Sequence, residues 1–346
     1  MKIAIATDAW EPQTNGVATS LKTTVRVLEE RGHEVHVLNA LNCKTFPLPT
    51  YSSIRLALFP YRYVKKALDN FQPDIIHIAT EGSLGWATRR YCLRNKLKFT
   101  TSYHTQFPEY IRLRAPIPLS WSYRFMAHFH NKAERTMVAT QSMENTLKPW
   151  VKHLARWTRG VDTDLFKPYD KNFLQAKRPV AMFVGRIAVE KNIEDFLKLD
   201  FSGSKYVVGD GPDFEMLKEK YPEVNFTGLK KGKELTQHIA AADVFVFPSK
   251  TDTFGLVMLE AMACGIPVAA YPVIGSVDVV ENNITGALDN DLADAITRAL
   301  KCRPSACREY ALNNTWAHAT DQFFNNLEVN KREKETNAQK FAKQMP

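Results

Sequence analysis

Two acidic residues in one short segment offer the clearest chemistry in this sequence. Asp252 lies in a predicted loop, and Glu260 lies just over one turn into a predicted helix over residues 256–264, in an otherwise apolar stretch. Charged side chains are seldom buried without a partner, and a vicinal diol is one partner that suits a carboxylate. The two residues therefore suggest a site for a hydroxyl-rich ligand. A structural ion pair is the alternative explanation for Glu260.

The start of the same helix offers backbone donors. The N–H groups of Phe254, Gly255, Leu256 and Val257 open the helix, and Gly265 is a suitable cap at its other end. Free N–H groups at a helix N-terminus attract anions, so this end of the segment can also meet a phosphate.

A second loop, over residues 185–192, carries two cations. It follows a predicted buried strand and precedes a helical pattern, which places Arg186 and Lys191 at the carboxyl end of the strand. Two cations there fit a diphosphate that gains negative charge as it leaves. A solvated surface pair is the alternative. The run 209–212 also follows a strand, and it fits either a phosphate contact or a tight turn.

Two further candidates come from the first half of the chain. Gly16 lies where the loop after strand 2–6 becomes a helix, and a glycine there lets the backbone approach an anion closely, although a plain turn explains it equally well. His104 lies at the carboxyl end of the predicted strand 99–103 and is expected to face the same cleft as the other candidate residues. In contrast, His33, His36 and His77 are interpreted as structural.

Alternating strands and helices must position these residues. Short apolar runs predict strands at 2–6, 34–39, 74–79, 99–103 and 136–140, and again at 180–184, 205–208, 224–227, 243–247 and 267–270. Helical patterns at 17–31, 83–95 and from about 119, then at 193–199, 213–221, 233–241 and 256–264, alternate with them. This alternation predicts two doubly wound α/β domains with parallel sheets, whose ligands bind beyond the carboxyl ends of the strands.

The predicted domains face each other across a cleft. Residues 1–165 form the first domain and residues 166–315 the second, with the break in the pattern near 158–179. A helix over 316–327 is expected to pack back on the first domain. The charged stretch 328–346 is interpreted as a tail.

The net charge of +9 is distributed unevenly. Residues 1–150 hold 20 Lys and Arg against 11 Asp and Glu, whereas residues 151–346 hold 26 of each. A basic first half attracts polyanions, either nucleic acid or an anionic membrane surface. Nucleic acid is disfavoured because the sequence contains no helix-turn-helix, RNP or zinc pattern.

Several function classes are disfavoured by what the sequence lacks. It has no apolar run of bilayer length and no signal-peptide pattern, and its five cysteines are scattered, so a cytoplasmic protein is expected. No Gly-x-Gly-x-x-Gly run opens the first helix, which argues against a nicotinamide enzyme.

Taken together, the motifs resemble those of glycosyltransferase family 4. The resemblance rests on residues 252–268, on 185–191, on Thr14-Asn15-Gly16-Val17 and on the segment 160–168, and it extends over about residues 1–327. It implies the GT-B fold, retaining transfer from a nucleotide sugar, and no need for a metal or other cofactor. Within the family, the sequence is most similar to bacterial lipid glycosyltransferases and GDP-mannose-dependent alpha-mannosyltransferases.

The resemblance also implies roles for the candidate residues. Glu260 would hold the donor ribose, Arg186 and Lys191 would neutralise the diphosphate, and Gly16 would place backbone beside it. His104 would lie by the transferred sugar and the acceptor. Asp252 would contact the sugar hydroxyls; the family usually has Glu there, so the contact and the sugar preference stay open.

Two segments suggest the acceptor. Residues 46–66 and 107–135 mix basic side chains with aromatic ones, which suits a membrane surface, although a core with a basic outer face is the alternative. We therefore expect a peripheral enzyme on the inner face of the cytoplasmic membrane. Its expected acceptor is a lipid, with diacylglycerol as the first candidate. The aromatic members of the two segments are Phe46, Tyr51, Phe59, Tyr61, Tyr63, Tyr110, Trp121, Tyr123, Phe125 and Phe129.

Two rival activities stay open. One is a mannosyl- or glucosyltransferase that acts on a soluble or polysaccharide acceptor, and the other is a sugar-nucleotide epimerase, which would need no acceptor. The sequence leaves the donor nucleotide open between UDP and GDP.

Overall fold

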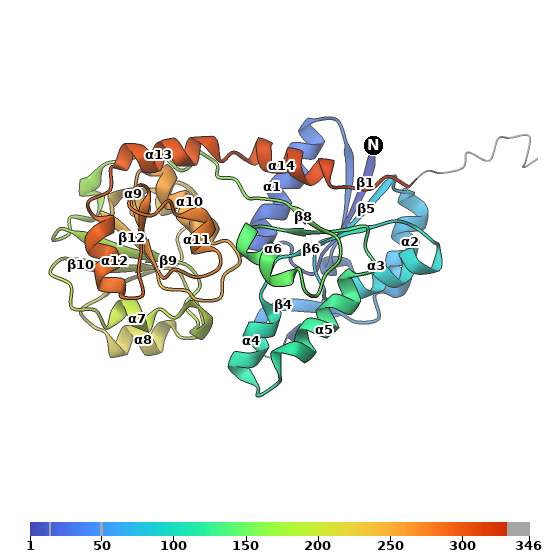
Figure 1. Ribbon diagram of the computed structural model, residues 1–346, viewed down its shortest axis with the longest axis horizontal. Helices are drawn as coiled ribbons and strands as arrows, with labels where there is room; N and C mark the ends of the chain where they lie inside the picture. The colour runs from blue at the N-terminus through green and yellow to red at the C-terminus, as the bar shows by residue number, and fades with distance from the viewer. Residues whose placement is uncertain (14, 49–50, 331–346) are drawn as a thin grey trace, which may run out of the picture.

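The chain folds into two α/β domains joined side by side, as Figure 1 shows for the computed structural model. The structure describes residues 1–13, 15–48 and 51–330. Thr14 and the part of the predicted tail after residue 330 lie outside the described residues, as do the side chains of Tyr51 and Arg114. Within the described ranges, no helix has the length and apolar character needed to cross a bilayer.

The first domain is built on a parallel sheet of six strands in the order β2-β1-β5-β6-β7-β8. The strands are β1 (Lys2–Ala6), β2 (Glu34–Leu38), β5 (Ile75–Ile78), β6 (Thr100–Tyr103), β7 (Arg135–Val138) and β8 (Leu154–Arg156). The helices are α1 (Gly16–Glu30), α2 (Tyr61–Phe71), α3 (Ser83–Arg94), α4 (Phe107–Arg114), α5 (Leu119–His130) and α6 (Gln141–Leu147). A hairpin of β3 (Thr45–Leu48) and β4 (Tyr51–Ala57) lies beside this sheet.

The second domain repeats the plan with the order β11-β10-β9-β12-β13-β14. Its strands are β9 (Val180–Val184), β10 (Ser204–Val208), β11 (Asn225–Gly228), β12 (Val244–Phe247), β13 (Val268–Ala270) and β14 (Gly286–Leu288). Its helices are α7 (Glu194–Leu197), α8 (Phe214–Lys220), α9 (Gly232–Ala241), α10 (Leu256–Ala263), α11 (Ser276–Val279), α12 (Leu292–Ala299) and α13 (Pro304–Asn313).

Apolar strands explain why each sheet is covered on both faces. In β1, Ile3 and Ile5 pack toward α1 on one face, while Ala4 and Ala6 pack toward α2 and α3 on the other. In the second domain, α9 and α10 cover one face of the sheet, and α7, α8 and α12 cover the other. The predicted α/β class and the predicted strands are confirmed, with small differences at their ends.

The chain crosses between the domains twice, and the two crossings touch. After β8 it runs through Gly160 into the second domain, and after α13 it returns through Thr315 to α14 (Trp316–Asn325). A Cβ on Gly160 would lie 2.3 Å from the backbone nitrogen of Trp316, so only glycine allows this approach. Helix α14 packs on α1, where Phe323 joins the core with Ile3 and Ile5, and Figure 1 shows α13 and α14 following each other along one side of both domains.

Candidate functional site

The carboxyl ends of the two sheets meet at the junction of the domains. Thr253, in the loop after β12, donates from Oγ1 to the carbonyl of His104 at 2.7 Å, just beyond β6. Gln106 donates from Nε2 to the carbonyl of Asp252 at 3.2 Å. The loops that sequence analysis singled out in separate domains are therefore in direct contact.

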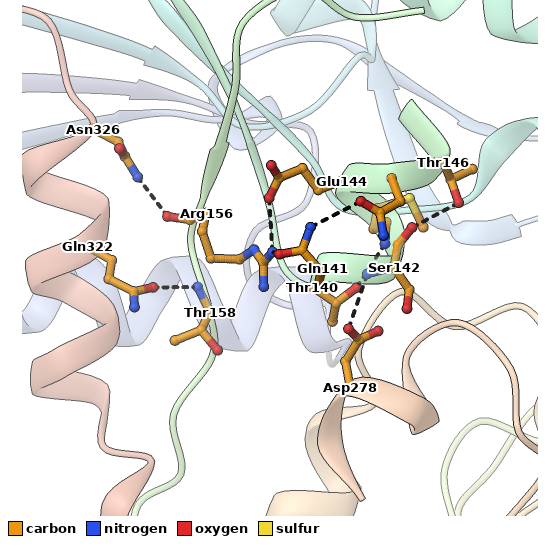
Figure 2. Close-up of polar contacts among 12 residues, drawn as sticks. Thr140, Gln141, Ser142, Glu144, Thr146, Arg156, Thr158, Asp278, Gln322 and Asn326 are labelled. Carbon is orange, nitrogen blue, oxygen red and sulfur yellow. Dashed lines mark hydrogen bonds and ion pairs between the residues drawn. The ribbon is translucent and has the colours of Figure 1, made fainter. Parts of the chain in front are cut away.

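A second contact between the domains lies at the start of α6, and Figure 2 shows it. The backbone N–H of Ser142 donates to Oδ1 of Asp278, on α11, at 3.1 Å. On the other side of this region, Gln322 of α14 accepts from the N–H of Thr158 at 2.9 Å. Arg156 Nη2 donates to Gln141 Oε1 at 2.7 Å and to Glu144 Oε2 at 2.9 Å, so the start of the interdomain segment is held between α6 and α14.

Lys191 and Asp252 form the central ion pair of the site. Lys191 Nζ lies 2.6 Å from Oδ1 and 2.8 Å from Oδ2 of Asp252, and both side chains are largely buried. Asn192 adds a hydrogen bond from Nδ2 to the carbonyl of Pro248 at 3.1 Å. The loop after β9 is thereby fixed against the loop after β12, and Lys191 is not the solvated surface cation of the alternative interpretation.

Arg186 lies directly after Gly185 at the end of β9 and is half-buried. Burial of Asp213 raises the pKa of its carboxyl, and the positive charge of Arg186 acts in the opposite direction. The loop that carries Arg186 is supported from below, because Ile187 donates to the carbonyl of Asp210 at 3.0 Å and a Cβ on Gly211 would lie 2.1 Å from the carbonyl oxygen of Ile187. The run 209–212 therefore forms a tightly packed support for this loop.

Helix α10 begins at Leu256, shortly after Asp252 of the ion pair. Gly255 precedes it with φ of +80°, and a Cβ there would lie 2.8 Å from both Met258 Cε and Phe247 Cζ, so the turn into the helix requires glycine. No side chain of the described residues caps this N-terminus. The first N–H groups of α10, from Leu256 onward, therefore keep their capacity to bind an anion.

Glu260 lies on α10, one turn beyond its start, and is partly buried. Burial raises the pKa of its carboxyl to about 7. Among the residues described, none forms a hydrogen bond or ion pair with this carboxylate. The structural ion pair that could have explained Glu260 is therefore not found there.

His104 is buried at the end of β6, in T-shaped contact with the ring of Trp157 at 5.4 Å. Its Nδ1 lies 2.9 Å from Nη2 of Arg159. Its Nε2 is buried and meets no hydrogen-bond partner in the described part of the chain. Burial, reinforced by the charge of Arg159, holds the pKa of His104 well below its usual range.

Gly16 is the first residue of α1, and Asn15 caps the helix by accepting from the N–H of Ala18 at 2.9 Å. A Cβ on Gly16 would lie 3.6 Å from Cδ1 of Leu256, at the start of α10. The N-termini of α1 and α10 therefore lie close together across the domain junction. The roles predicted for Gly16, Phe254, Gly255, Leu256 and Val257 stay predictions.

Other histidines and aromatic residues have structural positions. His77 is fully buried between Thr100 and Ser102, to which its ring nitrogens bond at 2.9 Å each. Tyr123 and Phe129, which sequence analysis grouped with a membrane-facing set, belong to the core of the first domain. In contrast, Trp121 and Phe125 are exposed.

The contributors to this junction that were not predicted include Arg159 and Gln106, beside the residues of the Ser142–Asp278 and Thr158–Gln322 contacts. Arg159 precedes Gly160 in the interdomain segment, and Gln106 follows His104 by two residues. Nothing in their local sequence marks them, because their partners lie far away in the chain. No group of three or more His, Cys, Asp or Glu side chains within the described ranges is arranged to hold a metal ion.

Comparisons with known proteins match both halves of the chain. A sequence profile of Glycosyltransferase Family 4 matches residues 14–165, and one of Glycosyl transferases group 1 matches residues 178–302. A GDP-mannose-dependent alpha-mannosyltransferase of Mycolicibacterium smegmatis is 30% identical, with 95% of this chain and 97% of that protein covered. An alpha-monoglucosyldiacylglycerol synthase of Streptococcus pneumoniae is 30% identical, with 88% and 79% covered.

Among solved structures, a sucrose-phosphate synthase from Thermosynechococcus elongatus superposes with a TM-score of 0.75. The superposition covers 94% of this chain and 97% of that chain at 21% identity, so it concerns the fold.

Proposed function

Because this chain belongs to glycosyltransferase family 4, we propose that it is a retaining enzyme that transfers a hexose from a UDP- or GDP-sugar to a lipid acceptor, with diacylglycerol as the first candidate. The chain has the GT-B fold and is a hexosyltransferase. The observation that carries the proposal is that the Lys191–Asp252 pair immediately precedes the uncapped N-terminus of α10, and that Glu260, one turn further along this helix, has no partner among the described residues.

The donor nucleotide lies along α10 in this proposal. Glu260 accepts hydrogen bonds from the two ribose hydroxyls, which gives its otherwise unpartnered carboxylate a partner and favours its charged form. The first N–H groups of α10 and the side chains of Arg186 and Lys191 surround the diphosphate. Lys191 has three N–H donors, so it can bind a phosphate oxygen while it keeps a bond to Asp252.

The reaction then depends on positioning and charge. The bond between the anomeric carbon and the phosphate oxygen breaks, and a bond from the acceptor hydroxyl oxygen to the same face of that carbon forms. The acceptor proton passes to the leaving phosphate. Arg186, Lys191 and the start of α10 stabilise the negative charge that grows on this phosphate, and the reaction needs no metal or other cofactor.

An exposed aromatic and basic surface on the first domain supports a lipid acceptor. Phe59 before α2, and Trp121 and Phe125 on α5, are 92%, 67% and 58% exposed. Trp86 of α3 connects them, because its ring lies 5.4 Å from that of Phe125 and α3 packs on α2. Aromatic rings enter a membrane interface while cations meet anionic headgroups; the exposed basic residues on α2, α3 and α5 are Arg62, Lys65, Lys66, Arg90, Arg94 and Arg124.

The relatives favour two donors. One relative is named for GDP-mannose and another for a monoglucosyldiacylglycerol product, so GDP-mannose and a glucose donor are the first to test. A mannosyl- or glucosyltransferase with a soluble acceptor is the second candidate, because the name of the first relative gives a mannose donor but no lipid acceptor. An epimerase is disfavoured, because one name states mannosyl transfer and the other states the synthesis of a glucosylated lipid.

The test begins with thermal shift and binding titration of UDP, GDP and ADP in EDTA. A nucleotide that binds the folded state raises its apparent stability. The matching nucleotide sugar is then incubated with vesicles that contain diacylglycerol, with soluble sugars, and alone. A glycolipid with retained configuration supports the proposal, a product only on soluble acceptors favours the second candidate, and an altered donor without acceptor indicates an epimerase. Binding of none of the nucleotides would contradict the proposal.

The exposed aromatic and basic surface also suggests where the protein acts in the cell. We propose that the protein acts on the inner face of the cytoplasmic membrane, attached peripherally through the surface around Phe59, Trp121 and Phe125. Co-sedimentation with anionic vesicles at low salt, and release at high salt, is the expected behaviour. Equal binding to neutral vesicles would argue against the role of the basic side chains.

A further inference from the structure

A buried arginine lies in the interdomain segment beside His104. Arg159 is 5% exposed, and it donates from Nη1 to the carbonyls of Trp157 and Thr158 at 2.6 and 3.0 Å. Its guanidinium carbon lies 4.3 Å from the centre of the Trp157 ring. Within the described ranges no Asp or Glu forms an ion pair with it. Burial lowers the pKa of Arg159 to about 9, which still leaves it charged at neutral pH.

The remaining contact of Arg159 determines the state of the histidine. Its Nη2 lies 2.9 Å from Nδ1 of His104. A guanidinium only donates hydrogen bonds, so Nδ1 must be the acceptor. A neutral imidazole with an accepting Nδ1 carries its proton on Nε2. The Nε2–H group is buried and has no acceptor among the described residues, which leaves it for a ligand oxygen.

The groups around the ring also disfavour a positive charge on it. Arg159 and Trp157 approach from the interdomain segment, His77 from β5 and His130 from α5, and Thr253 contacts the carbonyl of His104 from the other domain. Burial, then the charge of Arg159, then the two histidines hold the pKa of His104 well below its ordinary value. These surroundings therefore favour the neutral form of the ring.

We infer that Arg159 is a positioning residue, which holds His104 as the neutral Nε2–H tautomer so that it donates a hydrogen bond to a hydroxyl of the transferred sugar. This inference rests on the proposed function. A neutral donor suits the reaction because positive charge grows on the sugar ring as the phosphate leaves, and an imidazolium beside it would oppose that charge. In this state His104 cannot act as a base through Nδ1.

The chain offers a matched control. Arg89 is also buried, lies over a tryptophan ring (Trp86, 5.2 Å) and donates to two carbonyls, those of Phe129 at 3.1 Å and His128 at 2.9 Å. Unlike Arg159, it forms no hydrogen bond with a histidine ring in the described part of the chain. Arg159→Met and Arg89→Met therefore lose the same kinds of contact. Only the first removes the donor to Nδ1. Arg159→Lys keeps a group that can only donate.

The test is 15N NMR of the full chain with labelled histidine, in which His104→Gln identifies the His104 signals. The expected spectrum of the unchanged protein shows a pyridine-type Nδ1 and a protonated Nε2. In Arg159→Met we expect an Nδ1–H population and about a tenfold or larger loss of kcat, with the donor nucleotide Kd within about twofold. Arg159→Lys should keep the tautomer and more of the activity, and Arg89→Met should keep both.

Three results would overturn the inference. They are an Nδ1–H or a doubly protonated ring in the unchanged protein, an unchanged tautomer in Arg159→Met, and an equal loss of kcat in Arg89→Met. The spectrum of the unchanged protein decides the first even if Arg159→Met fails to fold. If no nucleotide sugar is turned over by the unchanged protein, the proposed function fails, while the tautomer is still measured independently.

Discussion

Thr253 and His104 are joined by a 2.7 Å hydrogen bond across the domain junction, from a side-chain hydroxyl in one domain to a backbone carbonyl in the other. The bond connects the loop after β12, which holds Asp252, to the end of β6. The neighbouring Gln106 bonds back to the carbonyl of Asp252, so the two loops hold each other in both directions. The two loops that carry the proposed donor and acceptor residues are thus brought together by contacts between the domains.

Removal of the Thr253 hydroxyl should weaken this contact without unfolding either domain. Thr253→Val keeps the side-chain shape and loses one hydrogen bond, which corresponds to about 1 kcal/mol, or roughly fivefold in donor affinity if closure accompanies binding. Calorimetric titration of the nucleotide sugar measures the change. Thr236→Val is the control, because its hydroxyl bonds to the carbonyl of Gly232 inside α9. Equal losses in both variants would exclude a specific role of the interdomain bond.

The parallel sheets could be predicted because their strands are nearly continuous apolar runs. Every residue of β9 is buried, and so is every residue of β12. These strands could therefore be recognised as continuous apolar runs, without an alternation of polar and apolar residues. The hairpin of β3 and β4 lies outside both sheets and was not predicted. Helix α2 was also not predicted, since only Val64 and Leu68 among its residues are buried. Helix α12 does show apolar spacing, with Leu292, Ala295, Ile296 and Ala299 buried, and it could have been recognised.

The candidate site could be predicted where position along a strand was sufficient. Arg186, Lys191, Asp252 and His104 all follow strands, and parallel strands bring such residues to one edge. Their pairing could not be predicted, because it depends on the packing of loops and domains. Lys191 and Asp252 are 61 residues apart, and Arg159 and His104 are 55 residues apart.

Neutralisation of Asp252 should change nucleotide affinity and kcat in opposite directions. Asp252→Asn removes a negative charge beside the expected diphosphate, so free nucleotide diphosphate should bind more tightly, by a few fold. If Asp252 also contacts the sugar, kcat should fall by about tenfold or more. Lys191→Met should weaken nucleotide binding. Titration and initial rates on the same preparations separate the two effects.

Asp252→Glu introduces the residue that the family resemblance implies at this position and serves as the matched variant. Its longer side chain should keep a bond to Lys191 while its carboxylate reaches further into the site. A change in preference between nucleotide sugars would assign Asp252 to sugar recognition. Identical preferences in Asp252→Glu and the unchanged protein would contradict that role.

The exposed aromatic surface should carry membrane affinity. Trp121→Ser combined with Phe125→Ser removes two rings that are largely exposed, so the fold should lose little stability while binding to anionic vesicles falls by about tenfold. Met216→Ser combined with Leu229→Ser removes exposed apolar side chains of the second domain and should change little. Vesicle co-sedimentation is the measurement, and similar losses in both double variants would refute a specific surface.

Substitution of Glu260 should raise the stability of the fold and weaken donor binding, because its carboxylate is buried without a partner among the described residues. Burial raises its pKa from 4.5 to about 7, so the folded protein holds a proton that the unfolded chain releases between these values. Stability therefore falls as pH rises from 4.5 to about 7, and the full cost, at most about 3.5 kcal/mol at 1.4 kcal/mol per pKa unit, is present above pH 7. Glu260→Gln should raise Tm at pH 8, leave it unchanged near pH 4, and weaken nucleotide-sugar binding at both ends of the neutral range. Glu219→Gln, on the exposed side of α8, should change neither property. A Glu260→Gln protein that is less stable at pH 8 would mean that the carboxylate stabilises the fold, and its assignment to the ribose would then lose its physical basis.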